Sequence, residues 1–215
     1  MKSYKCVVFD FDCTLTKRHF YHFLNNQSKF KKLYNKEFTD WKKIKELKER
    51  VKPYFEDRSC FISDNDIKSI LNIIIGGINR LKIIKSMLNK LYNNKVHLHI
   101  SSRGFTNEIY KFLRLYNLEN YFNFVNGCRN TYILLNDKNG DKYIKNTIKT
   151  NGKIDFFKRF IIDRYNFITY IDDDQKEHNI MKKYWKYNFI DSLQRDIGGG
   201  ISEKEIIIIE NIYKL

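Results

Sequence analysis

The chain has 215 residues, with 40 Lys and Arg against 25 Asp and Glu, which gives a formal net charge of +15. This length suits one medium domain, or a core with a small insertion, and is enough to bury a substantial apolar interior. No apolar stretch approaches the roughly 18 residues that a membrane-spanning helix needs, and no secretory signal is evident. We therefore expect a soluble, cytoplasmic protein without a membrane partner, and we make no prediction of its oligomeric state.

The cysteines and the basic charge exclude other classes of protein. Four cysteines without paired spacing argue against a disulfide framework and against a zinc site. The charge comes mainly from Lys in a sequence rich in Asn and Ile, as an AT-rich coding genome would give. Because nucleic-acid readers tend to use Arg for bidentate contacts, we favour a solvated basic surface over a nucleic-acid interface. Such a surface would still steer anionic substrates.

The first apolar segment leads straight into two carboxylates. Residues 6–9 are typical of a strand covered on both faces, and Asp10 and Asp12 follow it. Open α/β sheets bind their ligands at the carboxyl ends of strands. Two such acids repel each other unless a cation lies between them or one is protonated, and Asp can also attack phosphorus. We therefore prefer a metal site or an acid/base pair to an Asp-rich turn.

Residues 17–77 have the periodicity of helices. Apolar side chains recur at helical spacing over residues 20–24 and 41–51, with Lys and Glu on the other face. Ser63 offers an N-cap for a further helix. We predict a helical insertion between the first strand and the next α/β unit; the alternative is that these helices belong to the core.

Helices and strands alternate after residue 78. Amphipathic helices over 78–92 and 106–116 flank a strand at 96–100, which ends at Ser101 and Ser102. Residues 131–150 are typical of a hairpin around a turn at 136–140. A helix that opens at Lys153 then leads into a strand at 167–171. This order predicts an α/β fold with a doubly wound parallel sheet.

The strand at 167–171 ends in three adjacent acids, Asp172, Asp173 and Asp174. Three carboxylates at close range need a cation, and hard oxygen ligands suit Mg²⁺. The strand at 96–100 ends at Ser101 and Ser102, directly before a helix. A serine hydroxyl beside a helix N-terminus suits an anion, although it is also typical of a helix cap.

Two other features have structural interpretations. His97 and His99 share a strand face without an apparent third ligand, so we expect structural histidines. The three glycines at 198–200 lack the context of a phosphate loop. We expect them to form a flexible loop before a C-terminal helix that starts with a capping box at Ser202 and Glu205.

Four segments in this order resemble the motifs of the haloacid dehalogenase (HAD) superfamily of aspartate-nucleophile phosphohydrolases. Residues 10–14, with the sequence DFDCT, fit its first motif, an apolar strand followed by Asp-x-Asp-x-Thr. The strand that ends at Ser101 and Ser102 resembles the second motif. Lys153 resembles the third, and the paired acids Asp172 and Asp173 resemble the fourth.

The resemblance implies a Rossmann-like HAD core formed by residues 1–16 and 78–215, with a small helical cap at 17–77. It implies Mg²⁺-dependent hydrolysis of a phosphomonoester, carried by a small molecule, through an aspartyl-phosphate. Asp10 would attack phosphorus. Asp12 would protonate the leaving oxygen and then activate water, and Thr14 would support the loop.

The remaining roles by resemblance are ligand contacts. Ser101 or Ser102, together with Lys153, would hold the phosphoryl oxygens. Ser101 ends the strand directly and is slightly preferred, whereas Ser102 followed by Arg matches the small magnesium-dependent phosphatases. Lys149 and Lys158 are alternatives to Lys153, which its place at the helix start selects. Mg²⁺ would be bound by Asp10, the backbone carbonyl of Asp12, and Asp172 or Asp173.

Other functions stay open at this point. A phosphotransferase or mutase of the same superfamily would share the covalent intermediate. A basic nucleic-acid-binding module would keep the fold without turnover, but the presence of Asp10, Asp12 and Lys153 argues against it. In a nucleic-acid end-processing enzyme, a basic cap would guide a phosphorylated end to the site; such a partner is less favoured than a small molecule.

Overall fold

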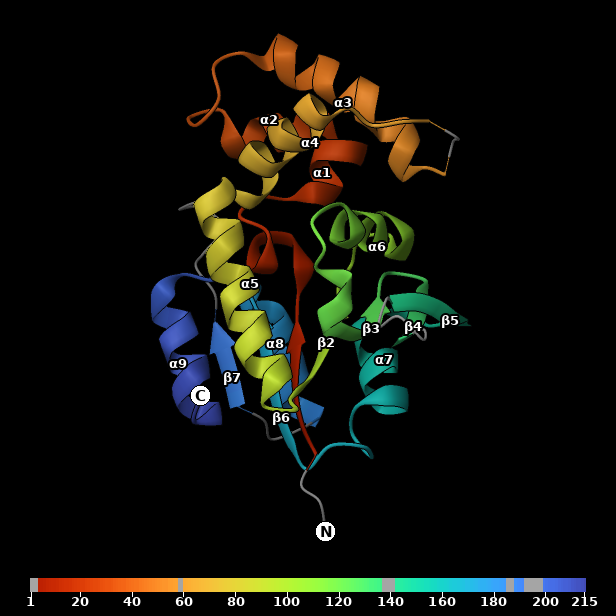
Figure 1. The fold of residues 1–215 in the computed structure, drawn as a ribbon, viewed down its shortest axis with the longest axis vertical. Coiled ribbons are helices and arrows are strands. Elements are labelled where there is room, and N and C mark those ends of the chain that lie inside the picture. Colours follow the sequence, from red (N-terminus) through yellow and green to blue (C-terminus); the bar gives the residue numbers. More distant parts are fainter. Residues whose placement is uncertain (1–3, 58–59, 137–141, 185–187, 192–198) are drawn as a thin grey trace.

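The computed structural model describes residues 4–57, 60–136, 142–184, 188–191 and 199–215 (Figure 1). Seven strands of these residues form one sheet in the order β5-β4-β3-β2-β1-β6-β7. Their bounds are β1 (Lys5–Phe9), β2 (His97–Ser101), β3 (Phe122–Asn126), β4 (Asn130–Asn136), β5 (Lys142–Lys149), β6 (Phe167–Asp172) and β7 (Asn188–Asp191).

The sheet is parallel at its centre and antiparallel at one edge. Strand β1 pairs in parallel with β2 and β6, and the parallel set extends to β3 and β7. Strand β4 runs antiparallel to both β3 and β5. The predicted doubly wound α/β sheet is therefore confirmed, and so is the pairing of the hairpin strands. The hairpin turn at 137–141 lies outside the described residues.

Alternate residues of β1 face two different helical layers. Val7 and Phe9 belong to an apolar cluster with residues of α5 (Ile78–Asn93), α6 (Thr106–Leu115) and α9 (Glu203–Tyr213). Cys6 and Val8 belong to a second cluster with α7 (Gly152–Phe160) and Met181 of α8 (Gln175–Tyr184). Because side chains alternate across a strand, these four buried residues fix β1 between both layers.

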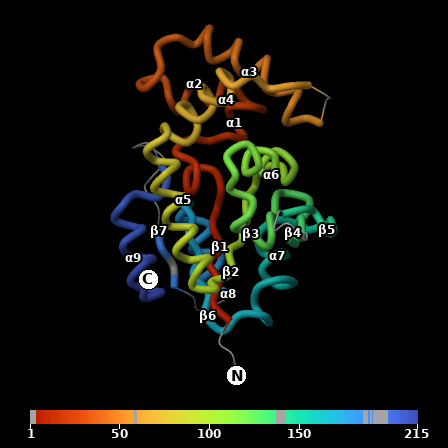
Figure 2. Tube along the Cα trace, viewed as in Figure 1, coloured from red at the N-terminus to blue at the C-terminus, as the bar shows by residue number. Residues whose placement is uncertain are grey.

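Residues 17–77 fold as helices, as the periodicity predicts. They form α1 (Phe20–Asn25), α2 (Gln27–Tyr34), α3 (Trp41–Phe55) and α4 (Asp64–Ile70), followed by the short turn η2 (Leu71–Ile75). The Ser63 hydroxyl accepts a hydrogen bond from Asp66 N (3.2 Å), so the predicted N-cap is confirmed. These helices gather beyond the carboxyl edge of the central strands, and the chain returns along α5 to β2 (Figure 2).

One apolar cluster runs from these helices into the sheet. Phe20 of α1, Val51 and Phe55 of α3, and Phe9 of β1 belong to it together. The rings of Phe20 and Phe112 lie 4.7 Å apart between their centroids, which joins α1 to α6. The division into a core and a separate cap stays a prediction.

The glycines before α9 pack against the turn that follows β1. That turn, η1 (Phe11–Leu15), has Cys13 in the left-handed region at φ 60°. Gly200 N donates to Cys13 O (2.7 Å), and Ile201 N donates to Thr14 O (2.8 Å). A Cβ atom at Gly199 would lie 2.8 Å from the Cβ of Cys13. The expected flexible loop is therefore wrong for Gly199 and Gly200, while residue 198 lies outside the described ranges.

The capping box at Ser202 and Glu205 starts α9, as expected. All four cysteines are free. Within the described ranges, no helix has both the length and the apolar character that crossing a lipid bilayer requires.

Candidate active site

The register of the central strands brings the predicted site residues to one level. Phe9 of β1 pairs with Ile100 of β2 and with Ile171 of β6. The next residues along these three parallel strands are Asp10, Ser101 and Asp172. The strand order changes direction at β1, because β2 lies on one side of it and β6 on the other. This is the switch point where open α/β sheets bind ligands.

Lys153 joins the two strand-end acids. Its Nζ lies 2.8 Å from Asp10 Oδ1 and 2.5 Å from Asp172 Oδ2. All three residues are buried, with exposed fractions of 5% for Asp10, 7% for Lys153 and 1% for Asp172. Lys153 comes from the first turn of α7, as the sequence predicts. An ion pair this deep requires the partners to compensate each other's desolvation.

Tyr170 adds a hydroxyl group to this network. It lies two residues before Asp172 on β6, so both side chains point to the same face of the sheet. The Tyr170 hydroxyl donates to Asp172 Oδ2 and accepts from Lys153 Nζ (3.3 Å). Tyr170 was not among the predicted site residues, although its same-face spacing from Asp172 was available as a signal.

The pKa values of the two acids shift in opposite directions. Burial raises the pKa of Asp10 well above its ordinary value, and the neighbouring Asp172 and Asp173 add to this despite the attraction of Lys153. Burial also opposes ionisation of Asp172, but the Lys153 ammonium and the hydrogen bond from Tyr170 outweigh it and lower the pKa of Asp172. A cation bound beside Asp10 would oppose this rise in pKa and favour the carboxylate form.

Three carboxylates form a candidate metal centre. Asp10, Asp172 and Asp173 each offer one oxygen atom, and these atoms lie within 4.8 Å of one another. When all three carboxylates are ionised, the Lys153 ammonium compensates one of their charges, and the net charge of the cluster is −2. Hard oxygen donors of this kind suit Mg²⁺, so the residues present fit the predicted cofactor. The Asp12 side chain is outside this group, and its predicted metal contact was through the backbone carbonyl.

Asp174 orients Asp172 and starts α8. Its backbone N donates to Asp172 Oδ1 (2.8 Å), and its Oδ1 accepts from Lys176 N (2.9 Å). The resemblance assigned the fourth motif to Asp172 and Asp173, and Asp174 lies outside the group of three that offers metal ligands.

Asp12 lies between the sheet and α1. Its Oδ1 accepts from Phe20 N (2.8 Å) and Tyr21 N (3.4 Å), the first amides of that helix. These contacts hold one carboxylate oxygen, and the residue lines the same pocket as Asp10. Thr16, which sequence reasoning missed, supports the turn, since its hydroxyl accepts from Cys13 N (3.1 Å).

The two serines are separated by the structure. Ser102 lines the pocket with Asp10 and Lys153, and its hydroxyl accepts from Gly104 N (3.2 Å). Ser101 is buried in β2, accepts from Asn126 Nδ2 (3.1 Å), and is not among the lining residues. The geometry therefore reverses the slight preference for Ser101. Thr14 is also buried outside the lining, and its carbonyl accepts from Ile201 N.

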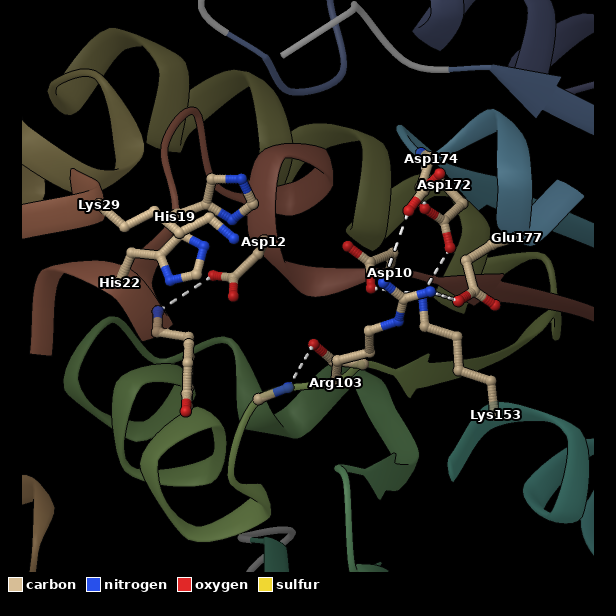
Figure 3. A pocket seen from close by; sticks show the side chains of 13 residues that line it. Asp10, Asp12, His19, His22, Lys29, Arg103, Lys153, Asp172, Asp174 and Glu177 are labelled. Atoms are coloured by element: carbon tan, nitrogen blue, oxygen red, sulfur yellow. Dashed lines mark hydrogen bonds and ion pairs between the residues drawn. The ribbon is translucent and has the colours of Figure 1, made fainter. Parts of the chain in front are cut away.

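The pocket has a volume of about 280 Å³ and a polar lining (Figure 3). None of the described residues that line it has an aliphatic side chain. Besides the predicted site residues, its lining includes members that sequence reasoning missed as site residues: His19, Tyr21, His22, Lys29, Arg103, Gly104 and Glu177. In a chain with many lysines and helical surface residues, no local pattern marks these positions.

The predicted structural histidines are confirmed. His99 is fully buried in β2, and its Nε2 lies 2.9 Å from the Tyr165 hydroxyl. His97 Nδ1 lies 3.1 Å from the same hydroxyl.

Comparison with known proteins gives distant structural matches only. No family model matches the sequence, and no curated protein matches it. The structure is similar to a phosphoserine phosphohydrolase-like protein from Francisella tularensis (18% identity, 95% of this chain, 92% of that chain, TM-score 0.42). It is also similar to the HAD domain of effector protein Lem4 from Legionella pneumophila (17%, 99%, 97%, 0.46). A third match is a HAD-superfamily hydrolase from Ehrlichia chaffeensis (15%, 100%, 98%, 0.43).

These matches span nearly the whole of each chain, and two of the three carry the HAD name.

Proposed function

We propose that the protein is a Mg²⁺-dependent phosphohydrolase of the HAD type that cleaves a phosphomonoester through an aspartyl-phosphate. The observation that carries this proposal is the buried Asp10, which lines a polar pocket at the end of β1 and is paired with Lys153 beside two further acids. This arrangement supports a nucleophilic role for Asp10, because phosphoryl transfer depends mainly on positioning and charge neutralisation.

In the first step, a carboxylate oxygen of Asp10 forms a bond to phosphorus while the bond to the leaving oxygen breaks. Asp12 gives its proton to that oxygen, so a neutral alcohol departs. In the second step, water attacks the phosphorus of the aspartyl-phosphate and Asp12 takes a proton from it. Inorganic phosphate leaves, and the Asp10 carboxylate is restored.

The other residues hold charge in place. Lys153 donates to Asp10 and would also donate to a phosphoryl oxygen, and the Ser102 hydroxyl would bind a second one. Asp10, Asp172 and Asp173 would hold Mg²⁺, with the carbonyl of Asp12 as a further ligand. When bound, the ion neutralises the negative charge that gathers on the phosphoryl group.

We propose that residues 17–77 act as a cap and that the substrate is a small molecule. His19, Tyr21, His22 and Lys29 come from this segment and line the same pocket as Asp10. A pocket of about 280 Å³ suits a small phosphorylated compound better than a polymer. The free cysteines agree with a reducing, cytoplasmic location. Transfer of the phosphoryl group to a second hydroxyl would use the same first step.

The test is phosphate release from a panel of phosphorylated metabolites with Mg²⁺ and with excess chelator. Wild-type protein should release phosphate only with Mg²⁺. Oligonucleotides with terminal phosphates belong in the same panel, and their cleavage faster than any metabolite would favour the end-processing function. No release from any compound would contradict the proposal.

A further inference from the structure

The cations that line the pocket differ in their partners. Lys153 is paired with Asp10 and Asp172 at one end. Arg103 is paired with Asp174 and Glu177. The charges of these two cations are therefore compensated inside the protein before any ligand arrives.

Lys29 is the exception. It lies in the first turn of α2, whose start is fixed because Asn26 Oδ1 accepts from Lys29 N (3.2 Å). Among the described residues, no acid lies within ion-pair distance of its ammonium. Two histidines from the same segment, His19 and His22, line the pocket with it, and their ring centroids lie 4.6 Å apart.

Figure 3 shows how these groups are arranged. Lys29, His19 and His22 gather at one end of the pocket, and Asp172, Asp174 and Glu177 lie at the other. Asp12 lies nearer the histidines than the acids of β6 do in this view. If Asp12 is the proton donor to the leaving group, as proposed, that group would extend from Asp10 past Asp12 toward Lys29.

We infer that Lys29, His19 and His22 bind a second anionic group on the substrate. This inference rests on the proposed function, and it narrows the substrate class to small phosphomonoesters whose leaving group carries a carboxylate or a second phosphate. An ammonium without an acidic partner makes a charge-assisted hydrogen bond to such a group, and imidazole nitrogens add donors. Apart from Gly104, the lining residues that the structure describes are polar, charged or aromatic, which disfavours a leaving group with a hydrocarbon tail.

The experiment compares three matched substrates: 2-phosphoglycolate, its uncharged amide, and ethylene glycol bisphosphate. kcat/KM is measured for each with wild-type protein, Lys29→Gln and Lys32→Gln. Lys32 is exposed on the same helix and is not among the residues that line the pocket. Its replacement therefore lowers the positive charge of the protein by the same amount without removing a lining residue. Comparing 2-phosphoglycolate with ethylene glycol bisphosphate shows whether the second anionic group is a carboxylate or a phosphate.

We expect wild-type protein to prefer at least one charged substrate over the amide. Lys29→Gln should reduce that preference about tenfold, the size of one charge-assisted hydrogen bond, mainly through KM. Lys32→Gln should keep the preference. An unchanged preference in Lys29→Gln, or equal losses in both variants, would overturn the inference while leaving phosphatase activity in place.

A binding measurement separates this inference from the proposed function. Calorimetry with phosphonoacetate and phosphonoacetamide needs no turnover. If no phosphoester is cleaved, the proposed function fails. Tighter binding of phosphonoacetate that depends on Lys29 would still support the anion site, and equal binding of the two compounds would contradict it.

Discussion

Lys153 of α7 and Asp10 of β1 are 143 positions apart in the chain, yet the ammonium and the carboxylate form a buried ion pair of 2.8 Å. The same ammonium reaches Asp172 of β6. The first turn of α7 therefore links β1 and β6 at the switch point. We expect both the stability at the carboxyl ends of these strands and the proposed chemistry to depend on the Lys153 ammonium.

Replacing Lys153 should affect both properties. In Lys153→Met, Asp10 and Asp172 lose their buried partner, so we expect the free energy of unfolding to fall by about 3 kcal/mol. Phosphate release should fall at least a hundredfold if the folded fraction is held constant. Urea unfolding and turnover measure the two effects. The matched control is Lys158→Met, which removes an exposed lysine of the same helix; an equal loss there would support the alternative third-motif lysine.

Asp12→Asn should preserve structure and lose proton transfer. Asn keeps an oxygen that can accept from Phe20 N, so α1 can start as before. General acid–base catalysis contributes about 10²- to 10⁴-fold, and we expect a loss in that range with alkyl phosphates. Aryl phosphates with good leaving groups should lose less in the first step. Equal losses on both classes of substrate would contradict the assigned role.

Mg²⁺ should stabilise the folded protein through the three acids. A ligand present at a hundred times its Kd adds about 2.7 kcal/mol, and a thermal unfolding series with increasing Mg²⁺ measures this gain. Asp173→Asn should reduce the gain, whereas Asp163→Asn, an exposed acid outside the site, should not. We expect Ca²⁺ to bind without supporting turnover, because it accepts looser geometry. Full turnover in excess chelator would remove the metal from the mechanism.

His99 should make stability depend on pH. Burial lowers the pKa of His99 well below its ordinary value, and the positive groups of His97, Arg164 and Lys142 add to this. The folded protein then keeps His99 neutral while the unfolded chain protonates it below about pH 6.5. The contribution of His99 to the free energy of unfolding should therefore not change with pH above that value. Below it, the free energy of unfolding should fall as the pH drops, by at most about 1.4 kcal/mol per pH unit.

The comparison with His99→Gln isolates this contribution. The free energy of unfolding of both proteins is measured between pH 8 and pH 5. The carboxylates that both proteins share contribute equally to the pH dependence, so their contribution cancels in the difference. We expect the wild-type curve to fall more steeply below about pH 6.5. Parallel curves would show that folding does not lower the pKa of His99.

The sequence predicts the parts of the fold and site that local patterns determine. The apolar run before Asp10 and the alternation before Asp172 mark parallel strands, and their carboxyl ends meet at one edge by geometry. Lys153 is predictable because it opens the helix before β6. The two serines are harder, because a shift of one residue reverses the direction of a side chain along a strand and no local signal sets that register.

Contacts between distant segments account for what the sequence did not predict. The docking of Gly199 and Gly200 against Cys13 depends on how the C-terminal segment returns to the first turn. Lys29 is one of many lysines until the fold of α2 brings it to the pocket. Such positions follow from tertiary packing, which residue type and spacing do not encode.

The central claim is that Asp10 becomes phosphorylated. Asp12→Asn protein should be mixed with p-nitrophenyl phosphate and Mg²⁺, quenched in acid, and analysed by peptide mass spectrometry. Because the good leaving group permits the first step while water activation is impaired, we expect a phosphoryl group on Asp10, and none on that peptide in the Asp10→Asn, Asp12→Asn double variant. A phosphoryl group on another residue, or wild-type turnover retained in Asp10→Asn with deamidation excluded, would contradict the assignment.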